Sequence, residues 1–135
     1  MIKLVALPKR KPGMTQQEFA DRWIKEHLKL STKMPGVRGY LVNIATEHQP
    51  AGDGVEPIYD GTAELWWDSM EAMEAAFESE EGKIAGVDAD KFADVRIHIY
   101  TEEHVAIPGP ERRAARRRAT ARRASAPKRR TALKR

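Results

Sequence analysis

Residues 15–34, with the sequence TQQEFADRWIKEHLKLSTKM, predict an amphipathic helix that packs one face against a core. At about 100° per residue, the apolar side chains fall on one arc of this helix and the charged side chains on the opposite arc. His27 lies near the centre of the apolar arc, which is otherwise formed by Phe19, Ala20, Trp23, Ile24, Leu30, Ser31 and Met34. The sequence therefore points an ionisable imidazole at the core.

Two interpretations of His27 follow from this position. A neutral imidazole offers one donor and one acceptor, and its reference pKa of about 6.5 lets burial or a neighbouring carboxylate make it a proton carrier near neutral pH. A histidine on an apolar face is also often a hydrogen-bonded core residue with no further role. The residues alone leave both interpretations open.

The ends of this helix are marked by local signals. Thr15 and Glu18 form a capping box, in which the Thr15 hydroxyl accepts from the Glu18 amide. Pro35 and Gly36 end the helical pattern.

The rest of the chain up to residue 107 alternates between strand and helix patterns. Asp68 and Ser69 begin a second helix that ends near Gly82, and residues 83–92 have room for a further helical turn or two. Apolar or alternating runs predict strands at 2–7, ending at Pro8, and at 37–48, 58–67 and 94–105. The stretch 49–57 is a polar loop with glycine and proline.

The order βαββαβ predicts an α+β ferredoxin-like plait with both helices on one face of an antiparallel sheet. In the strand at 58–67, Ala63, Leu65 and Trp67 share one face. We expect the other sheet face to carry Glu64, Trp66, Arg96, His98 and Tyr100. Such a face is too aromatic to remain in water, so the sequence predicts a homodimer in which two sheets close into a dimeric α/β barrel.

Length and composition favour one domain, residues 1–107, followed by a tail. The chain has no cysteine, which removes disulfides, thiolate metal sites and cysteine nucleophiles. No apolar run approaches the roughly 20 residues of a transmembrane helix, and the first residues do not form a secretory signal. We expect a soluble, cytoplasmic protein with no membrane partner.

The net charge of +4 combines two opposite parts. Residues 1–107 carry 12 Lys and Arg against 19 acids, whereas residues 108–135 carry 12 bases and one acid, Glu111. This tail has no apolar residue larger than alanine apart from one leucine and cannot build a core, so we expect a disordered arm that becomes helical on an anionic surface. It is a candidate to bind nucleic acid or another anionic partner; the alternative is a solubilising tail that lies against the acidic domain.

Four further residues are candidates to bind a ligand beside His27. Trp23 lies one turn before His27 and Tyr40 begins the next strand, so both are placed to contact a flat apolar ligand. Trp67 faces the helices if Ala63 does. Glu64 orients the imidazole if the strand pleat is reversed, and otherwise pairs across a dimer interface with Arg96. Each of these residues also has a purely structural interpretation.

We predict no cofactor and no metal. His48, His98 and His104 lack metal-ligand spacing, and no glycine-rich loop forms a phosphate cradle. Some unrelated barrels of this architecture hold haem, which leaves His27 as an axial haem ligand among the alternatives, by fold analogy alone.

Over residues 1–107 the chain resembles the EthD family. The resemblance is carried by IKLV at 2–5, KRKPGMT at 9–15, WIKEH at 23–27, PGVRGY at 35–40, YDGTAELWWDS at 59–69 and EHV at 103–105, in this order and spacing. It implies a small dimeric α/β barrel without an obligatory cofactor, found near pathways that degrade or tailor small organic molecules. The tail lies outside the resemblance.

The biochemistry implied by this resemblance is uneven. EthD itself is associated with an ether-degrading oxygenase system without a clear catalytic role, fungal relatives dehydrate polyketide intermediates, and a related muconolactone methylisomerase uses a helix histidine that His27 matches. The cysteine partner of that histidine has no counterpart in this chain.

Two functions from different classes are therefore expected. The first is cofactor-free proton transfer of the isomerase, cyclase or lyase type by His27 on a small apolar carbonyl or lactone compound. The second is a non-catalytic ligand-binding or accessory subunit of an oxidative, oxidoreductase-dependent degradation pathway.

Overall fold

A computed structural model describes residues 1–127 and divides the chain into two units, Met1–Glu103 and His104–Arg135. Residues 128–135 of the predicted tail lie outside the described residues. The elements follow in the order β1 (Ile2–Arg10), α1 (Gln16–Arg22), η1 (Trp23–His27), α2 (Leu28–Ser31), β2 (Gly39–Ile44), β3 (His48–Gln49), β4 (Gly52–Asp53), β5 (Gly61–Trp67), α3 (Met70–Glu78), α4 (Glu80–Ala89), β6 (Ala93–Glu102) and α5 (Pro110–Ser125).

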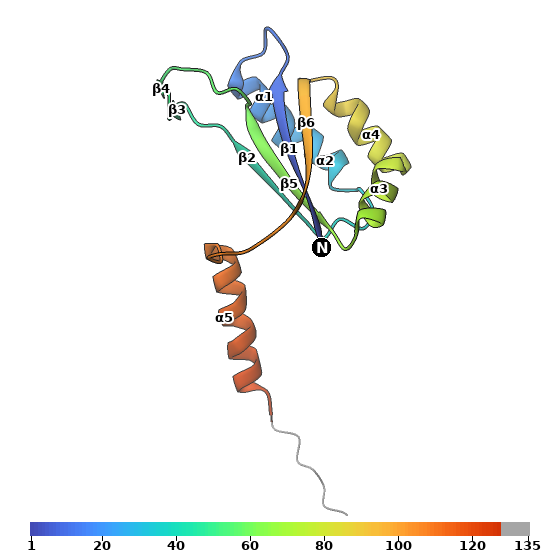
Figure 1. The fold of residues 1–135 in the computed structure, drawn as a ribbon, viewed down its shortest axis with the longest axis vertical. Coiled ribbons are helices and arrows are strands. Elements are labelled where there is room, and N and C mark those ends of the chain that lie inside the picture. Colours follow the sequence, from blue (N-terminus) through green and yellow to red (C-terminus); the bar gives the residue numbers. More distant parts are fainter. Residues whose placement is uncertain (128–135) are drawn as a thin grey trace, which may run out of the picture. The chain divides into compact units, whose positions relative to one another are not determined.

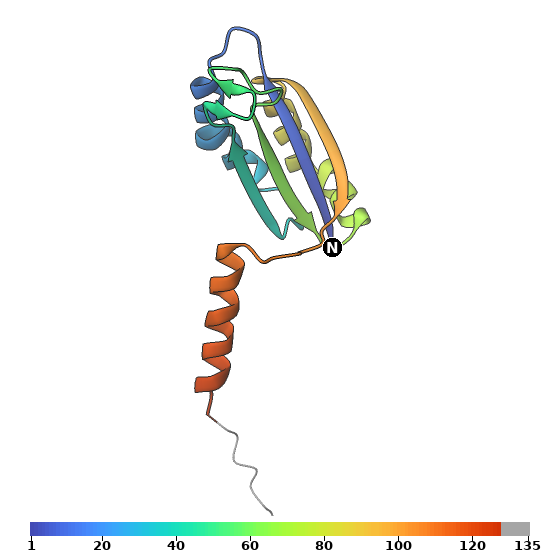
Figure 2. The ribbon, with the colours of Figure 1, turned by 60° about the vertical axis from the view of Figure 1, so that its left-hand side comes forward.

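The first unit is a four-stranded antiparallel sheet with helices on one face. The strand order is β2-β5-β1-β6, and the segments α1–α2 and α3–α4 cover the same side of the sheet (Figures 1 and 2). The other face of the sheet carries no helix of this unit (Figure 2). The predicted α+β ferredoxin-like plait is confirmed.

The first helical segment begins where the sequence predicts, but it ends at Ser31, before the predicted end at Pro35 and Gly36. The Thr15 hydroxyl accepts from the Glu18 amide at 3.1 Å, and the segment continues to Ser31. Its middle, η1, is a π-helix, which the 3.6-residue period does not anticipate. The wider turn keeps Trp23 and His27 buried and leaves Ile24, expected on the apolar arc, 48% exposed.

The second helical segment is two short helices in place of the single helix predicted to end near Gly82. Ser69 caps α3 by accepting from the Ala72 amide, and Ser79 caps α4 by accepting from the Gly82 amide. Both serines have extended backbone angles, which place the side-chain oxygen over the first turn of each helix.

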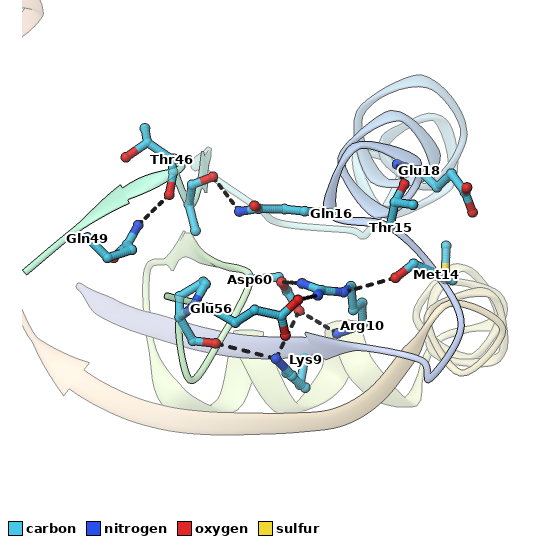
Figure 3. Close-up of polar contacts among 12 residues, drawn as sticks. Lys9, Arg10, Met14, Thr15, Gln16, Glu18, Thr46, Gln49, Glu56 and Asp60 are labelled. Carbon is cyan, nitrogen blue, oxygen red and sulfur yellow. Dashed lines mark hydrogen bonds and ion pairs between the residues drawn. The ribbon is translucent and has the colours of Figure 1, made fainter. Parts of the chain in front are cut away.

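The strand β1 is longer than predicted, since it continues past Pro8 to Arg10. Pro8 lies beyond the last pair of β1 with β5, Ala6 with Ala63, and its carbonyl accepts from the Asp60 amide. Arg10 is held by Asp60, whose carboxylate is 0% exposed. That carboxylate accepts from the Arg10 amide at 2.7 Å and also binds the Arg10 guanidinium (Figure 3). The guanidinium in turn binds Glu56, which ties the loop before β5 to the end of β1 (Figure 3).

The pleat of β6 is opposite to the prediction. Residues paired across antiparallel strands share a face of the sheet. On the helix-facing side, Leu4 of β1 pairs with Leu65 of β5 and Tyr100 of β6, and Ala6 pairs with Ala63 and His98 in the same way. Pro8 of β1 pairs with Arg96 of β6 on this side as well. The prediction that Arg96, His98 and Tyr100 lie on the open face with Glu64 and Trp66 is therefore wrong. The prediction assigned the polar residues of this strand to the open face, whereas the apolar residues Val95, Ile97 and Ile99 occupy that face.

The second unit contains α5, which spans residues 110–125 of the tail for which the sequence predicts disorder. Alanine and arginine have high helix propensity, and Pro110 at the first helical turn favours helix initiation. These local preferences outweigh repulsion between neighbouring arginines in residues 110–125. Within residues 1–127, no helix is long and apolar enough to cross a membrane.

Candidate functional site

A cavity of about 90 Å³ lies between the helices and the helix-facing side of the sheet. Its lining is mainly apolar or small, with Leu4, Leu65, Phe92 and Ala63 among the buried residues. The polar residues of the lining are His27, Ser31, Tyr40, Arg96 and His98. A small apolar cavity with a few polar groups is typical of a ligand site.

His27 enters this cavity from η1 and is 7% exposed. Its Nδ1 lies 2.8 Å from Oδ2 of Asp88 on α4. Arg22 holds the same carboxylate with both terminal nitrogens, Nη2 to Oδ1 at 2.6 Å and Nη1 to Oδ2 at 3.1 Å. The imidazole is therefore oriented by a carboxylate that is itself fixed by a two-pronged ion pair.

The surroundings keep His27 neutral at pH 7. Burial lowers the pKa of the imidazole below its ordinary value, and the nearby charges of Arg22 and Arg96 lower it further, while Asp88 opposes these effects. The hydrogen bonds from Arg22 lower the pKa of Asp88, so this carboxyl group is ionised. An ionised Asp88 accepts the proton on Nδ1, which leaves Nε2 as the nitrogen able to accept a proton from a bound molecule.

Tyr40 also lines the cavity, as predicted for a ligand-binding residue. The Ser31 hydroxyl donates to the Tyr40 oxygen at 3.1 Å, so the phenol keeps its own proton for another acceptor. Burial raises the pKa of Tyr40, which therefore stays protonated near neutral pH. Trp23 lines the cavity as well and packs edge to face on Phe19.

Two of the predicted ligand-binding residues lie elsewhere. Trp67 faces the helices and is buried, but it packs on Phe77 and donates to the Pro35 carbonyl at 3.1 Å, away from the cavity lining. Glu64 lies on the open sheet face and binds Lys3 at 2.8 Å. The prediction that Glu64 orients the imidazole is wrong, because the strand alternation puts Glu64 and His27 on opposite sides of the sheet. Within this chain Arg96 also lies on the helix-facing side, away from Glu64, and pairing across a dimer interface stays a prediction.

The sequence analysis missed the most important partners of His27. Asp88 follows Ala85 by three residues and precedes Ala89, so it shares the buried face of α4 with them. Assigning a helix over 80–89 would have placed an acid on an apolar face, which was the available signal. Arg96 and His98 were missed as site residues because the pleat of β6 was assigned the wrong way round.

The described residues form no group of metal ligands. Within residues 1–127, no three His, Asp or Glu side chains come together as a metal-binding group. Haem bound by His27 stays an alternative that rests on fold analogy alone, and we derive no step through it.

The fold and cavity define a ferredoxin-like α+β protein with a carboxylate-bound histidine in an apolar pocket. An EthD domain matches residues 11–96, which is more than half of the chain. The protein belongs to the EthD family, as the resemblance predicted, and the match lies within the predicted range of 1–107.

Solved structures support this assignment. An EthD family protein from Bacillus halodurans shares 31% identity, covers 77% of this chain and 99% of its own, and has a TM-score of 0.65. A dimeric ferredoxin-like protein of unknown function from Thermobifida fusca has 15% identity, coverage of 76% and 90%, and a TM-score of 0.60. SnoaB from Streptomyces nogalater, a cofactor-independent oxygenase, has 10% identity, coverage of 80% and 97%, and a TM-score of 0.57. The last two share the fold, and no curated protein matches this sequence.

Proposed function

We propose that the cavity is an active site in which His27 transfers a proton on a small apolar carbonyl or lactone compound without a cofactor. The observation that carries this proposal is the contact of His27 Nδ1 with Asp88 Oδ2 inside an apolar cavity. A structural histidine needs only satisfied nitrogens, whereas this one is oriented by a fixed carboxylate and keeps Nε2 for the ligand.

The reaction begins with His27 neutral. Nε2 takes a proton from the carbon next to the ligand carbonyl, and the C–H electron pair becomes the C=C bond of an enolate as the carbonyl π electrons move to oxygen. Asp88 stabilises the imidazolium that forms, because its negative charge lies 2.8 Å from Nδ1. When the ligand has a C=C bond next to the carbon that loses the proton, the enolate is conjugated with it, and return of the proton from Nε2 to the γ-carbon moves this double bond and completes an isomerisation with no atom gained or lost.

Tyr40 supplies the second group that this reaction needs. Its O–H proton is available because its oxygen accepts from Ser31, and a phenol donates well to a carbonyl oxygen on which negative charge develops. Trp23 packs beside this region as an apolar wall.

Exchange of ligand protons in D₂O tests this function directly. Wild-type protein is incubated with a panel of cyclic enones and unsaturated lactones, and deuterium incorporation next to the carbonyl is followed by NMR. We expect His27→Gln to slow the exchange of any active compound by about 10² to 10⁴, while His48→Gln, which changes an exposed histidine paired with Asp53, leaves it unchanged. Binding of a compound with no exchange in wild-type protein would instead assign the cavity to the accessory, ligand-binding alternative.

We also propose that two copies of the chain associate through the open sheet face. The fold relatives include dimeric proteins. On this face the edge strand β6 exposes a row of apolar residues, Val95, Ile97 and Ile99, and the opposite edge strand β2 exposes Leu41. An apolar face of this kind favours association in water.

For the tail we propose sequence-independent binding of nucleic acid by α5. Arg116, Arg117 and Arg118 are exposed and project around the helix at steps of about 100°. The helix has no apolar face for insertion into a membrane surface. A positive surface on all sides instead matches the closely spaced phosphates of a duplex.

The salt dependence of binding to a random-sequence DNA duplex tests this activity in the full chain. Replacing Arg116, Arg117, Arg118, Arg122 and Arg123 by glutamine should weaken binding, and the slope of log K against log salt should fall by about 0.9 for each phosphate that is no longer neutralised. Replacement of the domain residues Lys25, Lys29 and Lys33 by glutamine is the control. Equal binding by the tail variant and wild type would contradict the proposal.

A further inference from the structure

We propose that Arg96 and His98 form a subsite for an acidic oxygen of the ligand, so that the cavity takes small organic acids with an apolar body. This inference rests on the proposed function of the same cavity, because it names the class of compound on which His27 acts.

The two residues lie side by side at the cavity. They are two positions apart on β6 and therefore share its helix-facing side, where His98 pairs with Ala6 and Arg96 with Pro8. Both line the cavity together with His27. Since β6 is an edge strand, Arg96 and His98 remain accessible to solvent while His27 is buried, which places the cationic group at the exposed part of the lining.

The charge of the side chains that line this cavity is positive. Among the described residues that line it, none is acidic. Asp88 is neutralised by Arg22, and Asp90, on the solvent side, binds only Nη2 of Arg96 at 2.5 Å. A guanidinium has five N–H donors, so Arg96 retains donors for a second acceptor.

The histidine of the pair is also suited to an acidic oxygen. The His98 ring packs on Phe77 with centroids 5.9 Å apart, which fixes its position. Its partial removal from water, together with the charge of Arg96, lowers the pKa of His98, so near neutral pH it is a neutral donor or acceptor. Arg96, which also pairs with Asp90, therefore supplies the guanidinium donors of the subsite, and His98 supplies a hydrogen bond.

An apolar cavity with one cationic end matches one chemistry. Neutral apolar compounds would leave the Arg96 donors to water, whereas a carboxylate or an acidic enol oxygen forms charge-assisted hydrogen bonds with them. The same positive charge stabilises the enolate that forms when His27 removes a proton. The attraction between the guanidinium and the enolate oxygen is stronger in an apolar environment, where water screens it weakly.

The test compares benzoate with benzamide, two probes of nearly equal shape that differ in charge. Their dissociation constants are measured with the full chain by NMR shift titration at pH 7.5. We expect wild-type protein to bind benzoate about tenfold more tightly than benzamide. Arg96→Gln should remove this preference with benzamide affinity unchanged, and Arg96→Lys should keep part of it, which excludes loss of folding as the cause.

Two control variants separate the subsite from the proton-transfer function. Arg38→Gln changes an exposed arginine that pairs with Asp68 and does not line the cavity, and it should keep the full benzoate preference. His27→Gln should keep the preference as well, although it slows proton exchange. A wild-type protein that binds benzoate no more tightly than benzamide, or a preference that survives Arg96→Gln, overturns the inference whatever the result for His27.

Discussion

His27 and Asp88 are 61 residues apart in the sequence, yet His27 Nδ1 lies 2.8 Å from Asp88 Oδ2. The contact joins the π-helical turn η1 to α4, the two helical layers that enclose the cavity. It sets the orientation of the imidazole, and with it the direction in which Nε2 can exchange a proton.

Asp88→Asn should lower the pKa of His27 further. The carboxylate raises this pKa by its hydrogen bond and its charge, whereas burial, Arg22 and Arg96 lower it, so an amide at position 88 leaves the lowering effects unopposed. NMR titration of the imidazole measures the change, with Asp53→Asn as a control at an exposed carboxylate. An unchanged or raised pKa of His27 would show that Asp88 does not act on the ring.

The protein should lose stability as the pH falls from 7.5 to 5.5. The pKa values of His27 and His98 are lowered in the folded state, so below about 6.5 the unfolded chain binds more protons than the folded one. Their stabilisation is complete above pH 6.5 and decreases as the pH falls toward the folded-state pKa values. Urea unfolding at several pH values measures this, and His27→Gln should flatten the profile; a profile as steep as that of wild type would contradict the assignment to His27.

Asp60→Asn should destabilise the fold by about 3 kcal/mol, because it removes the buried charge that holds the partly buried Arg10 and leaves this guanidinium only the exposed Glu56 as a charged partner. The midpoint of urea unfolding gives this value. Asp53→Asn provides the comparison, since the exposed His48–Asp53 pair should contribute less than about 1 kcal/mol. Similar losses for the two variants would argue against the Arg10–Asp60 pair as an anchor of β1.

Two glycines of α4 should respond in opposite ways to alanine. A Cβ at Gly82 would lie 2.1 Å from the Ala76 carbonyl oxygen, so Gly82→Ala forces α3 and α4 apart and should cost about 2 kcal/mol. At Gly86 nothing lies within 4 Å, and Gly86→Ala should stabilise the helix by about 0.5 to 1 kcal/mol. Thermal unfolding of both variants measures these effects. A Gly82→Ala protein as stable as wild type would contradict the close contact between Gly82 and the Ala76 carbonyl.

Ile99→Glu should dissociate the proposed dimer, because it places a charge in the apolar row that Val95, Ile97 and Ile99 form on the open face of β6. Ile84→Glu on α4 is a matched control, since the two isoleucines are 46% and 47% exposed. Light scattering after size-exclusion chromatography gives the mass of each variant. A wild-type monomer, or a dimer retained by Ile99→Glu, would place the interface elsewhere or remove it.

Much of the fold could be predicted because its signals are local. The capping box at Thr15, the serine cap at Ser69 and the alternation of Ala63, Leu65 and Trp67 each depend on neighbours within a few residues. The candidate site was only half predictable, since His27, Trp23 and Tyr40 line the cavity but Trp67 and Glu64 do not.

The sequence by itself determined the order of elements, the helix that carries His27 and the opposite charges of domain and tail, because hydrophobic period, capping residues and composition are properties of adjacent residues. Only the tertiary structure decided which face of β6 meets the helices, and which residues therefore join His27. Strand alternation defines two faces without saying which is inside, and the pairing of β6 with β1 resolves this by placing Arg96 and His98 toward the cavity. A local pattern places Asp88 on the buried face of α4, but its contact with His27 depends on how α4 packs on η1, which is a long-range arrangement.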